Sequence, residues 1–454
     1  MTESEEQSGV RYRKLQNEKE ANDEPSTSAG GTLPSDDDEE DAMKVEEKLD
    51  RMRDVLPQAT DTLGSSTFDS MLSRFPDRWR NWVVRGVFSV VMIGGFAFIV
   101  QRGAIWLMAL VFLIQLKCFN EIIKIGLAVY RLYDLPWFRA LSWYFLVTSN
   151  YFIFGESLID YWSIVLRRDE FLRTLVVHHR FISFILYCIG FVWFVLSLQK
   201  GFYLRQFSLF AWTHVTLLLI VSQSFLIIQN LLQGLIWFLV PVSMIICCDI
   251  MSYMFGFFFG KTPLIKLSPK KTWEGFIGGA FSTVVFGILL STFLMRIPFF
   301  VCEVESYNEH GINCTIPSSF HLHEYDSPRA FKSIFKLLKR EPIVRIQPFL
   351  IHCTIMALFA SIIGPFGGFF ASGFKRAFKI KDFGDIIPGH GGLMDRFDCQ
   401  LLMGSFVNVY IHSFIRVPNW NKIVQQILWL PVEDQLAIHD ALHEQLVGIG
   451  AIAN

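Results

Sequence analysis

The segment from Gly367 to Asp398 contains the residue types that a polyphosphate site needs. Its 32 residues include five bases, four aspartates and a cluster of glycines. Glycines let backbone N–H groups approach phosphate oxygens, Lys and Arg neutralise phosphate charge, and carboxylates hold Mg²⁺. The candidates are Ser372, Lys375, Arg376, Lys381, Asp382, His390, Gly391, Gly392, Asp395, Arg396 and Asp398. An ordinary juxtamembrane loop with solvated charges explains any short piece of this segment, but it does not explain the whole combination.

Asp395 and Asp398 are the strongest metal-ligand candidates in this segment. They are three residues apart, and the apolar residues that follow indicate a helix from Leu393 onward. Residues at this spacing share one face of a helix. The spacing therefore suits two ligands of one metal centre.

A second block with chemical potential lies about 100 residues earlier. Asp249 is an ionisable residue within an apolar stretch, where a charge is costly and normally faces a partner or a wet cavity. Ser268-Pro269, followed by Lys270 and Lys271, predicts a helix start with Ser268 as its N-cap. A helix N-terminus with lysines is a phosphate-binding arrangement, although the same pattern also serves as a simple cap and orientation signal.

The elements that must position these groups are apolar helices. Hydrophobic residues make up 52% of the 454 residues, and the mean hydropathy is +0.37. Nine stretches approach or exceed the roughly 20 residues that a helix needs to cross hydrocarbon. They centre on Val87–Val100, Ala104–Leu116, Ala140–Phe154, Phe181–Leu198, Phe207–Ile228, Leu232–Phe259, Phe276–Met295, Phe349–Phe370 and Leu401–Ile415. We predict an all-α, polytopic integral membrane protein with about nine transmembrane helices over residues 74–415.

The two ends of the chain have a different composition. Residues 1–73 are rich in Ser, Glu, Asp, Gly and Pro, and residues 1–50 hold 16 acids against 6 bases. Such a segment cannot bury enough apolar surface to fold, so we expect a disordered acidic tail. Residues 416–454 alternate polar and apolar groups and predict an amphipathic C-terminal tail on the membrane surface or on a partner subunit. The net charge of −1 by itself argues against a nucleic-acid binder, but this total combines an acidic tail with a basic, apolar body.

Basic residues predict the orientation of the helices. Arginines before the first apolar stretch place the N-terminal tail in the cytosol, and counting crossings places Lys261–Lys271 and Lys375–Arg396 on the same side. The loop Pro298–Pro348 then lies in the lumen, where Cys302 and Cys314 can pair. An arginine-rich connection near residue 170 falls in the lumen by this count, which argues against the exact number of spans.

The Gly367–Asp398 segment resembles the signature of the phosphatidate cytidylyltransferases, the CDP-diacylglycerol synthases. The matching positions run Ser372-x-Phe-Lys-Arg-x4-Lys-Asp-x-Gly-x2-Ile-Pro-x-His-Gly-Gly-x2-Asp-Arg-x-Asp398. The block from Asp249 to Gly275 is similar to a second element of that family, Asp-x3-Tyr…Gly-Lys…Ser-Pro-Lys-Lys-Thr-x-Glu-Gly. The resemblance extends over roughly 74–415 and is strongest to the eukaryotic, endoplasmic-reticulum branch.

This resemblance implies an activity, a cofactor and a location. Members transfer CMP from CTP to phosphatidic acid, giving CDP-diacylglycerol and pyrophosphate, and they require Mg²⁺. The expected protein is a multi-pass enzyme of phospholipid biosynthesis in the endoplasmic-reticulum membrane, with a cytosolic active site and N-terminus, and it is expected to form a homodimer.

Roles for individual residues follow as expectations. Asp395 is expected to be the central metal ligand, with Asp398, Asp382 and Asp249 beside it. The bases are expected to neutralise the triphosphate and the lipid phosphate; they are Lys375, Arg376, Lys381, Arg396, Lys270 and Lys271. Ser372, Gly391 and Gly392 supply donors, and His390 orients a phosphate or shuttles a proton. Asn120 and Glu121, at a helix end, have no assigned role.

Other classes of protein predict different features. A CTP-dependent lipid kinase shares the basic loops and Mg²⁺ but transfers the γ-phosphate and releases CDP. A CDP-alcohol phosphotransferase needs an aspartate pattern that is not found in this sequence. A transporter accounts for the spans and for Asp249 but gives no reason for the phosphate-type segment. A catalytically dead paralogue does not need the intact set of carboxylates and bases.

Overall fold

The protein is described here from a computed structural model. The described residues are 77–129, 136–166, 170–265, 268–303, 307–308, 311–312, 316–326, 343–384, 391–415, 423–424, 427–428 and 430–452. The predicted acidic tail over 1–73 and His390 lie outside them. Every described residue belongs to one compact unit, Met52–Asn454.

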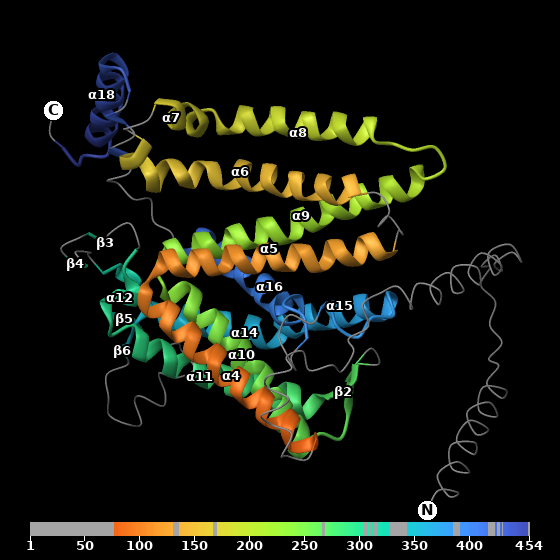
Figure 1. The fold of residues 1–454 in the computed structure, drawn as a ribbon. Helices are drawn as coiled ribbons and strands as arrows, with labels where there is room; N and C mark the ends of the chain where they lie inside the picture. Colours follow the sequence, from red (N-terminus) through yellow and green to blue (C-terminus); the bar gives the residue numbers. More distant parts are fainter. Residues whose placement is uncertain are drawn as a thin grey trace, which may run out of the picture. The chain divides into compact units, whose positions relative to one another are not determined.

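Helices dominate this unit (Figure 1). They are α4 (Asp77–Arg102), α5 (Ala104–Val129), α6 (Pro136–Leu166), α7 (Glu170–Val177), α8 (His179–Leu196), α9 (Tyr203–Leu232), α10 (Ile236–Phe259), α11 (Trp273–Leu294), α12 (Pro298–Val301), α14 (Pro348–Ile362), α15 (Gly364–Ala377), α16 (Met394–Tyr410) and α18 (Val432–Gly448). The described residues also include a 3₁₀ turn (Ser318–Phe320) and a π-helical turn (Ile411–Ile415). All nine predicted apolar stretches lie mainly on helices, which confirms the all-α class.

Six helical segments of the described chain are long and apolar enough to cross a membrane. They are Ala104–Val129, His179–Leu196, Tyr203–Leu232, Ile236–Phe259, Trp273–Leu294 and Pro348–Ala377, the last formed by α14 and α15 together. Bilayer hydrocarbon is about 30 Å thick, which a helix of about 20 residues spans. The protein is therefore a polytopic helical membrane protein, while the count of nine spans stays a prediction.

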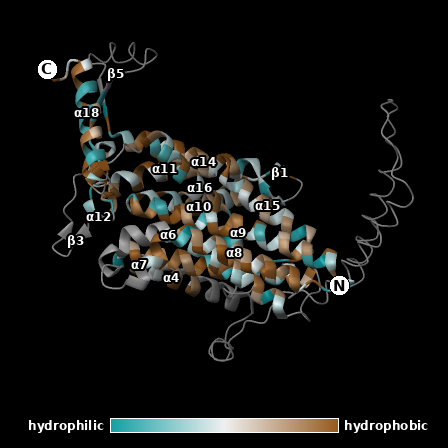
Figure 2. Ribbon diagram, turned by 90° about the horizontal axis from the view of Figure 1, so that it is seen from above, coloured by the Kyte–Doolittle hydropathy of each residue, from teal (hydrophilic) through white to brown (hydrophobic). Residues whose placement is uncertain are grey.

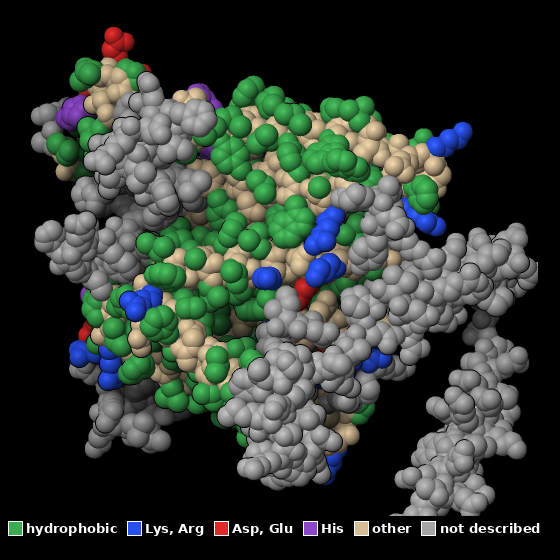
Figure 3. Space-filling model, in the orientation of Figure 1, with side chains coloured by type: hydrophobic (Ala, Val, Ile, Leu, Met, Phe, Trp, Pro, Cys, Tyr) green, Lys and Arg blue, Asp and Glu red, His purple; other side chains and the backbone are tan. Residues whose placement is uncertain are grey.

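The outer helix faces are apolar. Phe257, Phe281 and Leu289 are each exposed over more than 60% of their surface. Figure 2 shows hydrophobic residues along the helices, and Figure 3 shows hydrophobic side chains over much of the face in view, above α5, α6, α8 and α9. Contiguous apolar surface of this extent is unfavourable in water, and it is what lipid-facing helices require.

The helices pack in a continuous series. Helices α8, α6, α9 and α5 lie side by side, and α9 also contacts α16 (Figure 1). Helix α10 packs against α11, α14 and α16, and its buried residues Trp237, Met244 and Ile245 belong to the main apolar core. This arrangement brings residues from α5, α10, α15 and α16 to one region.

Small residues allow α10 and α11 to approach closely, and this closeness yields a prediction. A Cβ at Gly275 would lie 2.6 Å from the carbonyl oxygen of Ser252 and 3.1 Å from Cα of Gly256. Such overpacking costs about 1–3 kcal/mol. Gly275→Ala should lower the thermal unfolding midpoint of the detergent-purified protein, whereas Gly94→Ala, with nothing within 4 Å, should not. Equal midpoints would contradict the close packing.

Where the structure describes the chain, its strands form three antiparallel pairs. They are β1 (Pro263–Ile265) with β2 (Ser268–Thr272), β3 (Tyr307–Asn308) with β4 (Gly311–Ile312), and β5 (His323–Asp326) with β6 (Ile343–Ile346). All three lie in connections between helices.

The first hairpin corrects the expected helix start at Ser268. Ser268 pairs with Ile265, and Pro263 pairs with Thr272, so Lys270 and Lys271 lie on a strand. Helix α11 begins at Trp273, where the Thr272 hydroxyl accepts a hydrogen bond from Gly275 N at 3.3 Å. The helix therefore begins at the Thr272 cap, four residues after Ser268, because residues 268–272 pair with β1. Pro269 does not prevent this pairing, since proline is tolerated in an edge strand.

Two further expectations concern the ends of helices. Cys302, just beyond α12, is disulfide-bonded, and Cys314, its expected partner, lies outside the described residues. Helix α18 has no buried residue, and its expected place on a membrane or partner surface stays a prediction. Its exposed apolar residues include Leu436 and Leu442.

Candidate active site at the junction of α15 and α16

The C-terminal end of α15 delivers two bases to this region. Lys375 and Arg376 occupy its last turn. The helix is closed by a hydrogen bond from Ile380 N to the Lys375 carbonyl at 2.9 Å, and Lys379 adopts a left-handed conformation with φ of 54°. This is a common way for a helix to end and turn. The chain then returns towards the start of α16 at Met394.

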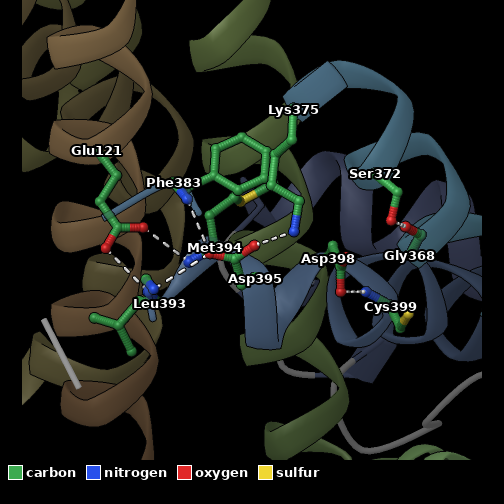
Figure 4. A network of polar contacts seen from close by, with 11 residues as sticks. Glu121, Gly368, Ser372, Lys375, Phe383, Leu393, Met394, Asp395, Asp398 and Cys399 are labelled. Carbon is green, nitrogen blue, oxygen red and sulfur yellow. Dashed lines mark hydrogen bonds and ion pairs between the residues drawn. The ribbon is translucent and has the colours of Figure 1, made fainter. Parts of the chain in front are cut away.

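Asp395, in the first turn of α16, organises the junction (Figure 4). Its Oδ1 forms an ion pair with Lys375 Nζ at 2.5 Å. Its Oδ2 accepts hydrogen bonds from Phe383 N at 2.9 Å and Gly392 N at 3.2 Å. The Asp395 side chain is only 7% exposed, against 21% for Lys375. One carboxylate thus connects α15, the following loop and α16.

Glu121, on α5, binds the first turn of the same helix (Figure 4). Its two carboxylate oxygens accept hydrogen bonds from Leu393 N and Met394 N, both at 2.9 Å. Glu121 is 4% exposed. The first N–H groups of a helix have no partner within the helix and attract negative charge. Glu121 therefore caps α16 from a distant part of the chain.

Two glycines permit these close approaches. A Cβ at Gly384 would lie 2.8 Å from Glu121 Oε1, and one at Gly392 would lie 2.7 Å from Gly384 N and 3.1 Å from Asp395 Oδ2. Gly391 has φ of +82°, a conformation that side chains rarely adopt. Its Cβ position lies 3.2 Å from the Asp382 carboxyl. These glycines allow the carboxylates of Glu121, Asp382 and Asp395 to pack closely against the backbone.

Asp398 lies one turn further along α16, in the region that Lys271 also reaches. Its Oδ1 accepts from Cys399 N at 2.7 Å. Its Oδ2 and Lys271 Nζ both lie 3.8 Å from the position that a Cβ of Gly368 would take. Burial raises the pKa of the Asp398 carboxyl above its ordinary value. The hydrogen bond from Cys399 N lowers this pKa, and the nearby charge of Asp249 raises it further. Asp398 Oδ2 and the Lys271 ammonium thus approach the same glycine of α15, and the charge of Lys375 also acts on Asp398.

Asp249, on α10, supplies a third carboxylate to the region. Its charge interacts with Lys271 and Arg396, and it also influences Asp398. Asp249, Lys271 and Arg396 are all exposed in the single chain. A carboxylate in the middle of an apolar helix is costly there and normally faces a charged partner, and the bases Lys271 and Arg396 are such partners for Asp249.

The structure brings together most, but not all, of the expected residues. Asp395, Asp398, Asp249, Lys375, Lys271 and Arg396 lie in one region, and Asp382 lies next to Gly391. Ser372 donates to the Gly368 carbonyl at 2.7 Å, as a helical serine often does. Arg376 and Lys381 are exposed. His390 and the side chain of Lys270 lie outside what the structure describes.

Two groups, the Gly392 N–H donor and the Asp395 carboxylate acceptor, differ from the expected use. The Gly392 N–H is bound to Asp395, and both Asp395 oxygens accept protein donors. Asp249 and Asp398 are the more open carboxylates. Within the described residues, no three His, Cys, Asp or Glu side chains are grouped so that they could hold a metal ion alone.

Glu121 is the site residue that sequence reasoning left without a role. The sequence did indicate that Glu121 has a partner, because an acidic residue within an apolar helix normally binds one. Nothing in the sequence linked it to Leu393 and Met394, which follow 272 and 273 residues later.

The fold is that of a multi-pass helical membrane protein. Where α15 ends and α16 begins, it carries a cluster of carboxylates and bases that is suited to phosphate chemistry. The chain belongs to the cytidylyltransferase family, whose sequence model matches residues 83–414.

Named relatives agree with this membership. The chain is 69% identical over 422 residues to a phosphatidate cytidylyltransferase of Caenorhabditis elegans, covering 93% of this chain and 90% of the relative. It is 56% identical over 386 residues to the human phosphatidate cytidylyltransferase 2, covering 84% and 86%. It is 53% identical over 415 residues to the human phosphatidate cytidylyltransferase 1, covering 91% and 87%.

Proposed function

We propose that this protein is a phosphatidate cytidylyltransferase, which transfers CMP from CTP to phosphatidic acid and releases pyrophosphate. The observation that carries the proposal is the cluster of Asp249, Asp395, Asp398, Lys271 and Lys375 in a chain of the cytidylyltransferase family. Relatives that bear this name match it over most of both chains. The product, CDP-diacylglycerol, is a precursor in phospholipid biosynthesis.

The reaction is an in-line displacement at phosphorus. A phosphate oxygen of phosphatidic acid forms a bond to the α-phosphorus of CTP, and the bond from that phosphorus to the oxygen bridging to the β-phosphorus breaks, so pyrophosphate leaves with the electron pair. A phosphate oxygen is already a competent nucleophile, so positioning and charge neutralisation supply most of the catalysis. Lys271, Lys375 and Arg396 neutralise the triphosphate and the lipid phosphate.

The carboxylates of this region fit Mg²⁺. Carboxylate oxygens are the ligands it prefers, and Mg²⁺ commonly binds through one or two carboxylates together with substrate phosphates. Asp249 and Asp398 are the pair best placed for this role, since the oxygens of Asp395 are occupied by Lys375 and two backbone donors. Bound Mg²⁺ would offset the charge that develops on the departing pyrophosphate.

Lys375 provides a direct test of substrate binding. Lys375→Ala removes a partly exposed cation between Asp395 and Asp398, and should raise the apparent KM for CTP or for phosphatidic acid by about tenfold, the effect of one charge-assisted contact. Steady-state kinetics with each substrate varied in turn measures it. Lys200→Ala, in the exposed turn between α8 and α9, should leave both constants unchanged. Unchanged constants in Lys375→Ala would place that side chain outside the substrate site.

The protein is proposed to reside in the endoplasmic-reticulum membrane with its site and N-terminus cytosolic. The disulfide at Cys302 supports this orientation, because disulfides form in oxidising compartments such as the lumen. Lys271 lies just before the start of α11, and Cys302 lies beyond its end. The 22 residues of α11 span about 33 Å, which is enough to place the two residues on opposite sides of the membrane. The expected homodimer is tested by native mass spectrometry in detergent.

Product identity separates this function from the kinase alternative. Purified protein should release pyrophosphate from CTP only when phosphatidic acid and Mg²⁺ are present. CDP release in its place would indicate transfer of the γ-phosphate, and no turnover of CTP would favour a transporter or an inactive paralogue.

A further inference from the structure

The N-terminus of α16 is an anion-binding element whose anion is part of the protein. Free N–H groups at the start of a helix, together with the helix dipole, readily bind phosphate or carboxylate. Here Leu393 N and Met394 N both donate to Glu121, and the neighbouring Gly392 N donates to Asp395. Three successive N–H groups are therefore bound by protein carboxylates.

The Glu121 contact differs from an ordinary helix cap because it joins distant parts of the chain. A local Ser, Thr or Asp would satisfy the same N–H groups. Glu121 instead reaches from α5, so it fixes where α16 begins relative to α5. Gly384 and Gly392 pack against its carboxylate so closely that a Cβ at either would lie within 3.0 Å of it.

Burial makes this arrangement sensitive to change. A carboxylate that is 4% exposed is costly unless its oxygens are hydrogen-bonded, and the two N–H groups of α16 supply those bonds. The turn held in this way also carries Gly392, and Asp395 follows directly. Asp395 in turn pairs with Lys375. Movement of the turn would therefore displace an aspartate and a lysine of the candidate site together.

We infer that Glu121 is a positioning residue of the active site: it holds the turn from Gly392 to Asp395 in place, and it occupies the anion site of α16 so that substrate phosphates bind to the basic side chains. The inference rests on the proposed function for its kinetic effect. The anchoring of the turn by Glu121 is independent of that function.

Two substitutions at one position test this inference. Glu121→Gln keeps the shape and one acceptor oxygen but turns an NH₂ group towards an N–H of α16, and Glu121→Ala removes both acceptors. The matched control is Gln115→Leu, which removes a buried polar group of the same helix whose amide bonds Asn150 on α6 at 2.8 Å. All variants are made in the full chain and purified in detergent.

The expected kinetic result is a loss in kcat of about 10- to 100-fold for Glu121→Gln, as found when groups that orient ligands are altered, with a larger loss for Glu121→Ala. The KM for CTP should change little, because Glu121 does not touch substrate. The unfolding midpoint of Glu121→Gln should fall no further than that of Gln115→Leu, which should keep its kcat. Wild-type kcat in both Glu121 variants, or an equal loss of kcat in Gln115→Leu, would overturn the inference.

Hydrogen exchange followed by mass spectrometry gives a readout without turnover. In Glu121→Gln, the amides of residues 393 and 394 should exchange faster, while peptides from α9 should be unchanged. Unchanged exchange at 393 and 394 would overturn the anchoring role even if activity fell. If the wild type released no pyrophosphate but exchange changed as expected, the proposed function would fail while the anchoring held.

Discussion

Asp395→Asn is expected to lower kcat by on the order of 10³-fold, equivalent to roughly 4 kcal/mol of lost transition-state stabilisation. The carboxylate accepts from the Lys375 ammonium and from two backbone N–H groups. An asparagine must turn its NH₂ group towards one of these three donors, which leaves that donor without an acceptor and releases Lys375 from its position. Pyrophosphate release from CTP and phosphatidic acid measures the loss.

The control for this variant is the same chemical change far from the site. Asp434→Asn, in the exposed helix α18, should retain wild-type turnover. Expression and detergent extraction of Asp395→Asn should remain normal, because no packed apolar group is removed. Near-normal turnover in Asp395→Asn would contradict the assignment of the α15–α16 junction as the active site.

Asp249→Asn is expected to have the second-largest effect. The side chain is an exposed carboxylate within α10 whose charge interacts with Lys271 and Arg396. Loss of one of two proposed Mg²⁺ ligands should lower kcat by about 10²-fold and raise the Mg²⁺ concentration needed for half-maximal turnover. A Mg²⁺ titration at saturating CTP separates these two effects.

A substitution two residues earlier on α10 serves as control. Cys247→Ala changes a partly buried side chain of the same helix and should leave the Mg²⁺ dependence unchanged. If Asp249→Asn kept the wild-type Mg²⁺ dependence, Asp249 would not be a metal ligand, whatever happened to kcat.

The helices were predictable because lipid-facing and core helices both need continuous apolar sequence. The stretch Phe349–Phe370, for example, is found on α14 and α15, and Phe276–Met295 on α11. The hairpin at Ser268–Thr272 was not predictable, because a Ser-Pro helix start and a short extended segment share the same local signals. The choice between them depended on pairing with Pro263–Ile265.

The candidate site was predictable where its residues are close in sequence. Lys375, Asp395 and Asp398 fall within one motif, and Asp249 was conspicuous as a charge in an apolar stretch. Two contacts of the site depend on how α5, α15 and α16 pack. Asp395 binds Lys375 and the loop, and Glu121 caps α16. Spacing along the chain contains no information about such contacts between distant elements.

The most direct test of the central claim follows the phosphorus atoms of CTP. Purified protein is incubated with phosphatidic acid, Mg²⁺ and CTP labelled on either the α- or the γ-phosphate. We expect the α-label to enter the lipid product and the γ-label to appear in pyrophosphate, with both transfers lost in Asp395→Asn. Entry of the γ-label into lipid, or label transfer that survives in Asp395→Asn, would contradict the account.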